Sequence, residues 1–96
     1  MFSWLTNWWK RGEKGRPDLH IVMFTRQGCH LCAAAWKLLT DRQAVYGFSL
    51  TVKDVDANPE LSARFGDCVP VVEVNGQVRF RGHVNDVLLQ RLLARG

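Results

Sequence analysis

Residues 19–32 read LHIVMFTRQGCHLC and establish the fold class of this chain. The first seven of these residues form a nearly continuous apolar run of strand length, which is typical of a central strand covered on both faces. Gly28 then interrupts the run, and residues 30 to about 46 have a helical composition. Cys29 and Cys32 therefore lie where the first strand passes into the first helix.

Strand and helix patterns alternate beyond this stretch. The first helix is expected to end at Gly47, and residues 48–55 alternate at period two, as in a second strand. Asn58 and Pro59 are typical of the cap and the first position of a short helix that runs to about residue 65. The predicted inner face of the first helix contains Leu31, Ala34, Ala35, Leu38, Leu39 and Val45.

Two further β-rich runs, residues 69–74 and 77–81, are joined by Asn75-Gly76, which is the strongest short-range signal of a hairpin. Residues 85–94 form the last predicted helix. The order β-α-β-α-β-β-α indicates one α/β domain over residues 19–96. The predicted inner face of the last helix contains Val87, Leu88 and Leu92, with Leu89 at its edge.

Residues 1–18 form a distinct segment in front of this domain. Residues 1–10, MFSWLTNWWK, gather their tryptophans and other apolar side chains on one side of a helical wheel, which predicts a short amphipathic helix. Residues 11–18 contain two glycines, a proline and mixed charge, as expected for a linker. Three binding partners for the apolar side stay open: this chain or a second copy of it, a membrane surface, or a partner protein.

The charge distribution argues against a nucleic-acid partner. The formal net charge of +4 comes mainly from residues 1–16, and the body that follows is almost neutral. A nucleic-acid surface would spread lysine and arginine over one face of that body. The 3 cysteines are too few for the disulfide framework of a small secreted domain. We therefore expect a cytoplasmic protein, with membrane association through residues 1–10 as an open alternative.

Cys29 and Cys32 carry the predicted chemistry. Cys29 is expected at the amino-terminus of the first helix, where unpaired backbone N–H groups and the helix dipole favour a thiolate. Cys32 lies one turn further along, close enough to form a disulfide with it. Cys29 would attack a substrate disulfide, and Cys32 would resolve the mixed disulfide. A C-x-x-C at this place in a βαβ pattern is the signature of a thioredoxin-like redox site.

Residues 25–32, the Val69-Pro70 loop and the order of elements together resemble a glutaredoxin-like protein of the thioredoxin superfamily, in a short bacterial C-x-x-C branch. The resemblance covers residues 19–95. It implies a four-stranded mixed sheet in the order 2-1-3-4, flanked by helices. It also implies a cis bond before Pro70, which would leave the Val69 backbone free to align a substrate.

The same resemblance implies a glutathione site. Arg26 stands where the family commonly has a lysine that meets a glutathione carboxylate, and Val69 would offer its backbone to the glutathione cysteine. Gly82 and Asp86 match a glycine-rich turn that holds the rest of the tripeptide. Glutathione is thus a candidate reductant, and no bound cofactor is expected. The departures from the family pattern are His30, Leu31, Cys68 and His83.

The sequence therefore predicts a thiol–disulfide oxidoreductase that reduces disulfides of proteins or mixed disulfides with glutathione. Two alternatives stay open at this point. One is a metal or iron–sulfur protein that uses Cys29, Cys32 and Cys68 as ligands. The other is an interaction module that acts through the Trp-rich residues 1–10.

Overall fold

The computed structural model describes residues 17–94. The predicted amphipathic helix of residues 1–10 and most of the predicted linker lie outside the described residues. No helix within residues 17–94 is long and apolar enough to cross a bilayer. The elements are β1 His20–Thr25, α2 His30–Tyr46, β2 Ser49–Asp54, η1 Val55–Ala57, α3 Pro59–Phe65, β3 Val71–Val74, β4 Gln77–Arg81 and α4 Asp86–Ala94.

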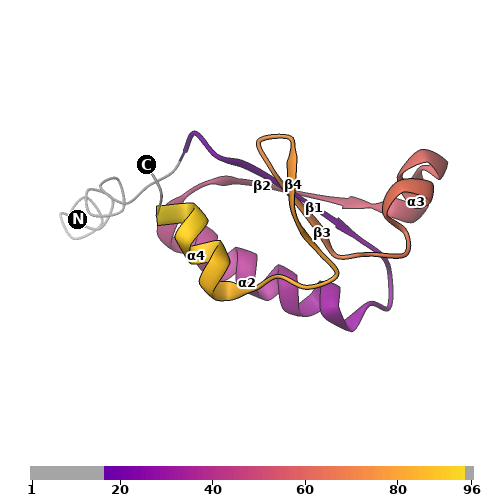
Figure 1. The fold of residues 1–96 in the computed structure, drawn as a ribbon, viewed down its shortest axis with the longest axis horizontal. Coiled ribbons are helices and arrows are strands. Elements are labelled where there is room, and N and C mark those ends of the chain that lie inside the picture. The colour runs from indigo at the N-terminus through magenta and orange to yellow at the C-terminus, as the bar shows by residue number, and fades with distance from the viewer. Residues whose placement is uncertain (1–16, 95–96) are drawn as a thin grey trace, which may run out of the picture.

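The four strands form one mixed sheet in the order β2-β1-β3-β4, which confirms the predicted order 2-1-3-4. β1 is central and pairs in parallel with β2 and antiparallel with β3, and β4 returns beside β3. The parallel pair requires a crossover, and α2 provides it. Figure 1 shows the sheet with α2 and α4 running together on one side and α3 at the far end of the molecule.

The predicted hairpin between β3 and β4 is present. Asn75 and Gly76 both have positive φ, 50° and 84°, as a tight hairpin turn of this kind requires. The Asn75 side-chain oxygen also accepts the backbone N–H of His20 at 2.8 Å, so the turn is tied to the start of β1. The hairpin therefore closes at the end of the sheet opposite to Cys29.

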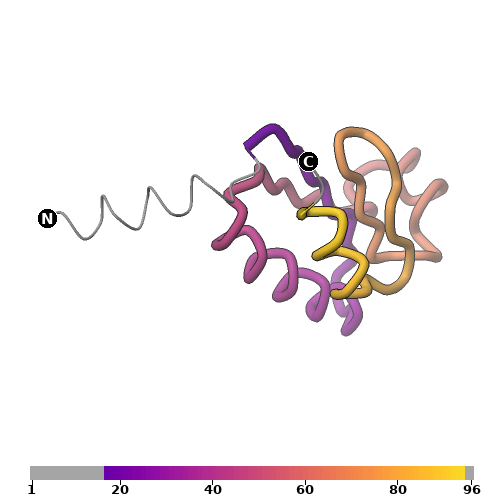
Figure 2. The backbone as a smooth tube through the Cα atoms, turned by 60° about the vertical axis from the view of Figure 1, so that its left-hand side comes forward, coloured from indigo at the N-terminus to yellow at the C-terminus, as the bar shows by residue number. Residues whose placement is uncertain are grey.

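The sheet separates two apolar clusters, because alternate side chains of β1 point to opposite faces. Ile21 and Met23 belong to the larger cluster, which α2 and α4 cover, while Phe24 belongs to a smaller one against α3. Figure 2 shows α2 and α4 on one side of the strands and α3 on the other. The prediction that the first strand is covered on both faces is thus confirmed for this part of the chain.

The inner face of α2 differs from the prediction. Its buried residues are Cys32, Ala35 and Leu39, whereas Ala34 lies in solvent, as do Leu31 and Val45. The first half of this helix is rich in small apolar residues on every side, so the apolar pattern leaves the rotation of the helix open. The contact with the sheet selects the buried stripe.

The inner face of α4 differs in part from the prediction: Leu92 packs against the larger cluster as expected, whereas Val87 and Leu88 do not. Leu89 and Leu93 are fully buried, whereas Val87 and Leu88 are more than half exposed. Five of the nine residues of this helix are valine or leucine, so several faces are comparably apolar. Packing against α2 and the sheet selects the pair four residues apart.

Candidate active site

The two clustered cysteines meet at the amino-terminus of α2. Cys29 is the N-cap residue, and its Sγ accepts the backbone N–H of Cys32 at 3.1 Å. The N-terminal N–H groups of a helix have no partner within the helix, so the sulfur of Cys29 satisfies one of them. The positive end of the helix dipole also points toward this sulfur, which favours a negative charge on it.

The two cysteines differ in exposure. Cys29 is half-buried and can be approached from solvent, whereas Cys32 is only 3% exposed. Burial raises the pKa of the Cys32 thiol, and the hydrogen bond and the charge of Cys29 raise it further. Hydrogen bonds from Thr25 and from the backbone of Arg26 lower this pKa, but by less than burial and the Cys29 hydrogen bond raise it. The pair therefore consists of an accessible thiol and a shielded, protonated one.

The Val69-Pro70 loop lies at the same end of the sheet. Phe24 of β1 pairs with Val71 of β3, and continuing this antiparallel register places Pro70 and Val69 across from Thr25 and Arg26. The Val69–Pro70 peptide bond is cis, Pro70 is buried, and Val69 is half-buried. The loop and Cys32 thus both lie against the last residues of β1.

Gly82 joins this group through Pro70. The backbone N–H of Gly82 donates to the Pro70 carbonyl at 2.8 Å, immediately after β4 ends. His83, which follows, is exposed. The structure therefore brings Val69, Pro70 and Gly82 to one end of the sheet.

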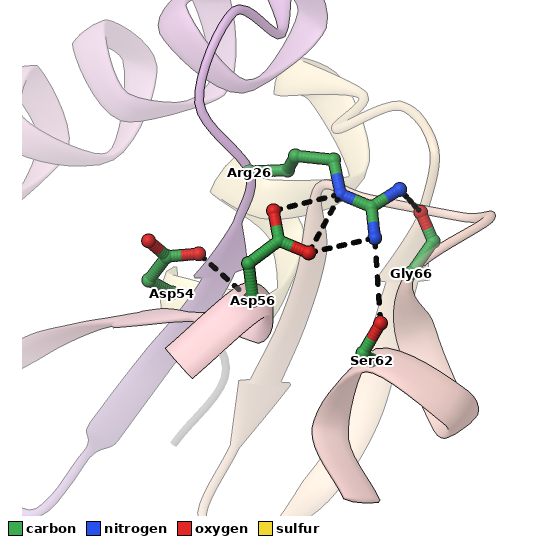
Figure 3. A network of polar contacts seen from close by, with 5 residues as sticks. All are labelled: Arg26, Asp54, Asp56, Ser62 and Gly66. Carbon is green, nitrogen blue, oxygen red and sulfur yellow. Dashed lines mark hydrogen bonds and ion pairs between the residues drawn. The ribbon is translucent and has the colours of Figure 1, made fainter. Parts of the chain in front are cut away.

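The guanidinium of Arg26 is enclosed by partners from its own chain, as Figure 3 shows. Its Nε and Nη2 donate to the two carboxylate oxygens of Asp56 at 2.9–3.3 Å. Its Nη1 donates to the carbonyl of Gly66 at 2.9 Å, and Nη2 also reaches the Ser62 hydroxyl at 3.4 Å. The hydrogen bond and charge of Asp56 raise the pKa of Arg26. Most donors of Arg26 are thus engaged within the chain, and its contact with a glutathione carboxylate stays a prediction.

Asp56 and Ser62 were not predicted from the sequence. β1 and β2 are parallel, and Thr25 pairs with Asp54, so the residues after both strands meet at one edge. Asp56 follows in η1, whose first turn is held by a hydrogen bond from the Asp56 N–H to the Asp54 carboxylate at 2.9 Å. An acidic residue just after a strand parallel to β1 was the signal that could have identified the partner of Arg26.

Asp86, the other predicted glutathione contact, is paired with α2. Arg42 donates from Nε and Nη2 to the two carboxylate oxygens of Asp86 at 3.1 and 2.8 Å. The hydrogen bond from Arg42 lowers the pKa of Asp86. Along the axis of α2, Arg42 lies about 20 Å from Cys29, because each residue of a helix adds about 1.5 Å. The Asp86 carboxylate is therefore bound to the second half of α2.

Cys68 belongs to the surroundings of the smaller apolar cluster. Its side chain packs against the cluster that contains Phe65, and its Sγ lies 3.8 Å from Nη1 of Arg81. Among residues 17–94, no three Cys, His, Asp or Glu side chains form a group that could hold a metal ion.

Comparisons with known proteins identify relatives of this chain. Residues 20–94 match the family model described as Glutaredoxin-like domain (DUF836). The chain is 33% identical over 85 residues to the uncharacterized protein Mb0520 of Mycobacterium bovis, covering 83% of this chain and 86% of that protein. The uncharacterized protein Rv0508 of Mycobacterium tuberculosis matches to the same extent, with 33% identity over 85 residues.

Solved structures show the same fold. The solution structure of protein Ne2328 from Nitrosomonas europaea has a TM-score of 0.68 at 25% identity, covering 80% of this chain and 92% of that one. Oxidised thioredoxin from Plasmodium falciparum has a TM-score of 0.59 at 22% identity, with 86% and 85% covered. Mitochondrial thioredoxin 3 from Saccharomyces cerevisiae has a TM-score of 0.60 at 20% identity, with 93% and 87% covered. The likeness establishes a thioredoxin-like fold.

Proposed function

Since the chain belongs to the glutaredoxin-like domain family, we propose that it is a thiol–disulfide oxidoreductase that reduces disulfides of proteins or mixed disulfides with glutathione through Cys29 and Cys32. The observation that carries the proposal is the unequal environment of the two thiols. Cys29 is accessible and accepts a hydrogen bond at a helix amino-terminus, whereas Cys32 is buried one turn behind it.

In the first step, the Cys29 thiolate attacks one sulfur of a substrate disulfide. A bond forms between Cys29 Sγ and that sulfur, the substrate S–S bond breaks, and the other sulfur leaves as a thiolate that takes up a proton. The backbone N–H of Cys32 and the helix dipole stabilise the negative charge on Cys29 before the attack. The accessible cysteine is therefore the nucleophile.

In the second step, Cys32 loses its proton and attacks Cys29 Sγ. The Cys29–Cys32 bond forms, the mixed disulfide breaks, and the second substrate sulfur leaves as a thiolate. Cys29 carries no charge in the mixed disulfide, so its contribution to the raised pKa of Cys32 is gone when Cys32 must react. The substrate gains two electrons, and this chain is left with a disulfide that a thiol reductant of the cytoplasm, such as glutathione or a dithiol protein, must reduce.

Val69 and Pro70 would align the substrate for this attack. They precede β3 and lie across from the last residues of β1, next to the segment that carries Cys29. An extended peptide could pair with the Val69 backbone as an added strand. We therefore assign Val69 and Pro70 a positioning role, and Gly82 supports Pro70 through its hydrogen bond.

Cysteine variants test the proposal. We expect Cys29→Ser to abolish turnover of a glutathionylated peptide with glutathione and its reductase as electron source. Treated with the glutathionylated peptide in the absence of free glutathione, Cys32→Ser should accumulate a mixed disulfide on Cys29, because the resolving attack is missing, and intact-protein mass spectrometry would detect it. Cys68→Ser is the matched control and should keep the wild-type rate. Wild-type turnover by the Cys29→Ser variant would rule the proposal out.

A further inference from the structure

We infer that Asp56 shifts the preference of this site among disulfides: it occupies Arg26 as an internal carboxylate and so disfavours glutathione relative to substrates without a carboxylate at this position. The inference rests on the proposed function and concerns its substrate class. The Asp56–Arg26 pair favours protein disulfides, because these can be held through the Val69 backbone without a charged contact to Arg26.

The geometry of the guanidinium is the main argument. A guanidinium takes a carboxylate through two parallel N–H donors along one edge. The edge formed by Nε and Nη2 is bonded to Asp56, and the edge formed by Nη1 and Nη2 faces Gly66 and Ser62. Both edges are thus engaged, so a substrate carboxylate can form a two-donor pair with Arg26 only by displacing Asp56 or the weaker contacts to Gly66 and Ser62.

The solvent exposure of Arg26 and Asp56 indicates how strongly this ion pair disfavours a substrate carboxylate. The side chain of Arg26 is 35% exposed and that of Asp56 is 49% exposed. Ion pairs with this much access to water are weak, so a competing carboxylate can displace Asp56 at a modest cost. Asp56 therefore lowers the preference for an anionic substrate without abolishing its reaction.

Asp86 provides an independent observation of the same kind. The resemblance gives this residue a contact with the rest of the glutathione molecule, but both of its carboxylate oxygens are bonded to Arg42. The two side chains that would hold glutathione by charge, Arg26 and Asp86, are thus each paired within the chain. Neither pair is required by the thiol chemistry of Cys29 and Cys32.

The test compares two small disulfides that differ in charge. Oxidised glutathione carries carboxylates, and bis(2-hydroxyethyl) disulfide carries none. The second-order rate constant for oxidation of the reduced chain is measured with each, for wild type and for Asp56→Asn. We expect the ratio of the glutathione rate to the neutral rate to rise about two- to fivefold in the variant, the size typical of a solvent-exposed ion pair.

Asp67→Asn is the matched control. Asp67 raises the pKa of Arg26 through its charge alone, without a hydrogen bond to it, so this variant removes the same charge but frees no donor. We expect a clearly smaller rise in the ratio. In the double variant Arg26→Gln/Asp56→Asn, the rise in the ratio should disappear, because the Arg26 cation that Asp56→Asn releases is no longer present.

The outcomes separate this inference from the proposed function. An unchanged ratio in Asp56→Asn, an equal rise in Asp67→Asn, or a large loss of the neutral rate in Asp56→Asn would each overturn the assignment of Asp56. Failure of the wild-type chain to react with either disulfide would instead count against the proposed function.

Discussion

At the scale of single residues, the spacing of the two cysteines produces their different environments. Cys29 precedes the first turn of α2 and lies at the open end of the helix, whereas Cys32 shares a buried stripe with Ala35 and Leu39. These three lie at i, i+3 and i+7 and face the sheet. The resolving thiol is thus a core residue, and its protonation is governed by burial.

This burial predicts the pH dependence of Cys32. Because the pKa of Cys32 is raised in the folded chain, its thiolate form appears only at higher pH than in the unfolded chain. We expect the midpoint of the alkylation rate of Cys32 by iodoacetamide, measured against pH in Cys29→Ser, to lie above the midpoint for the same variant in urea. The wild-type midpoint should lie higher still, since Cys29 contributes to the shift. Equal midpoints in the folded and unfolded chain would refute the role of burial.

At the scale of elements, α3 is a short helix that connects the two sides of the site. Asn58 caps it by accepting the N–H groups of Glu60 and Leu61 at 2.8 and 3.4 Å. Its other end supplies the Ser62 hydroxyl and the Gly66 carbonyl to Arg26. Through these contacts the helix links the end of β1 to the segment that leads into the Val69-Pro70 loop.

The packing of Gly66 predicts that alanine is destabilising there. Gly66 has helical backbone angles, φ −54° and ψ −33°, where alanine is usually tolerated. A Cβ atom would lie 2.5 Å from the Ser62 carbonyl oxygen and 2.9 Å from Nη2 of Arg26. We expect Gly66→Ala to lower the free energy of unfolding by about 1–3 kcal/mol, as overpacking does.

Urea denaturation would measure this change in the free energy of unfolding, provided that its slope against urea concentration is the same in both proteins. In Arg26→Gln the loss caused by Gly66→Ala should be smaller but still present, because the Ser62 carbonyl remains. A gain of about 0.4–1 kcal/mol, which a glycine-to-alanine change brings at an unhindered helical position, would contradict the packing argument.

At the scale of the whole molecule, α2 and α4 form one layer over the sheet. They share the larger apolar cluster, and the Arg42–Asp86 ion pair joins them at the surface. Figures 1 and 2 both show the two helices side by side. Because of its position, the Arg42–Asp86 ion pair stabilises the packing of α4 rather than the thiol site.

The lowered pKa of Asp86 gives this pair a defined pH dependence. A carboxyl group with a lower pKa in the folded state contributes stability above its ordinary pKa, and the contribution is lost as the pH falls through the folded value. We expect Asp86→Asn to be less stable than wild type at pH 7, with the difference shrinking as the pH falls below about 4, the ordinary aspartate pKa, and vanishing only below the lowered pKa of the folded state. Asp41→Asn, in the exposed Lys37–Asp41 pair, is the control. A difference that is the same at pH 7 and at pH 2.5 would exclude an ionic origin.

The strands and helices, their order and the place of the two thiols were predictable from the sequence, because these features depend on local chemistry. A continuous apolar run indicated β1, Asn58 capped α3, and Asn75-Gly76 closed the hairpin, each through interactions within a few residues. The Cys29–Cys32 pair follows from the same local reading, since a three-residue spacing at a helix start requires no knowledge of the rest of the chain.

Only the tertiary structure decided the buried faces of the helices and the partners of the charged side chains. α4 is apolar enough to pack in more than one rotation, and the sheet selects Leu89 and Leu93. Arg26 meets Asp56 across 30 positions of sequence, and Arg42 meets Asp86 across 44. A charged side chain pairs with whatever the fold brings within hydrogen-bonding distance, so the availability of Arg26 to a substrate was settled by the parallel packing of β1 and β2.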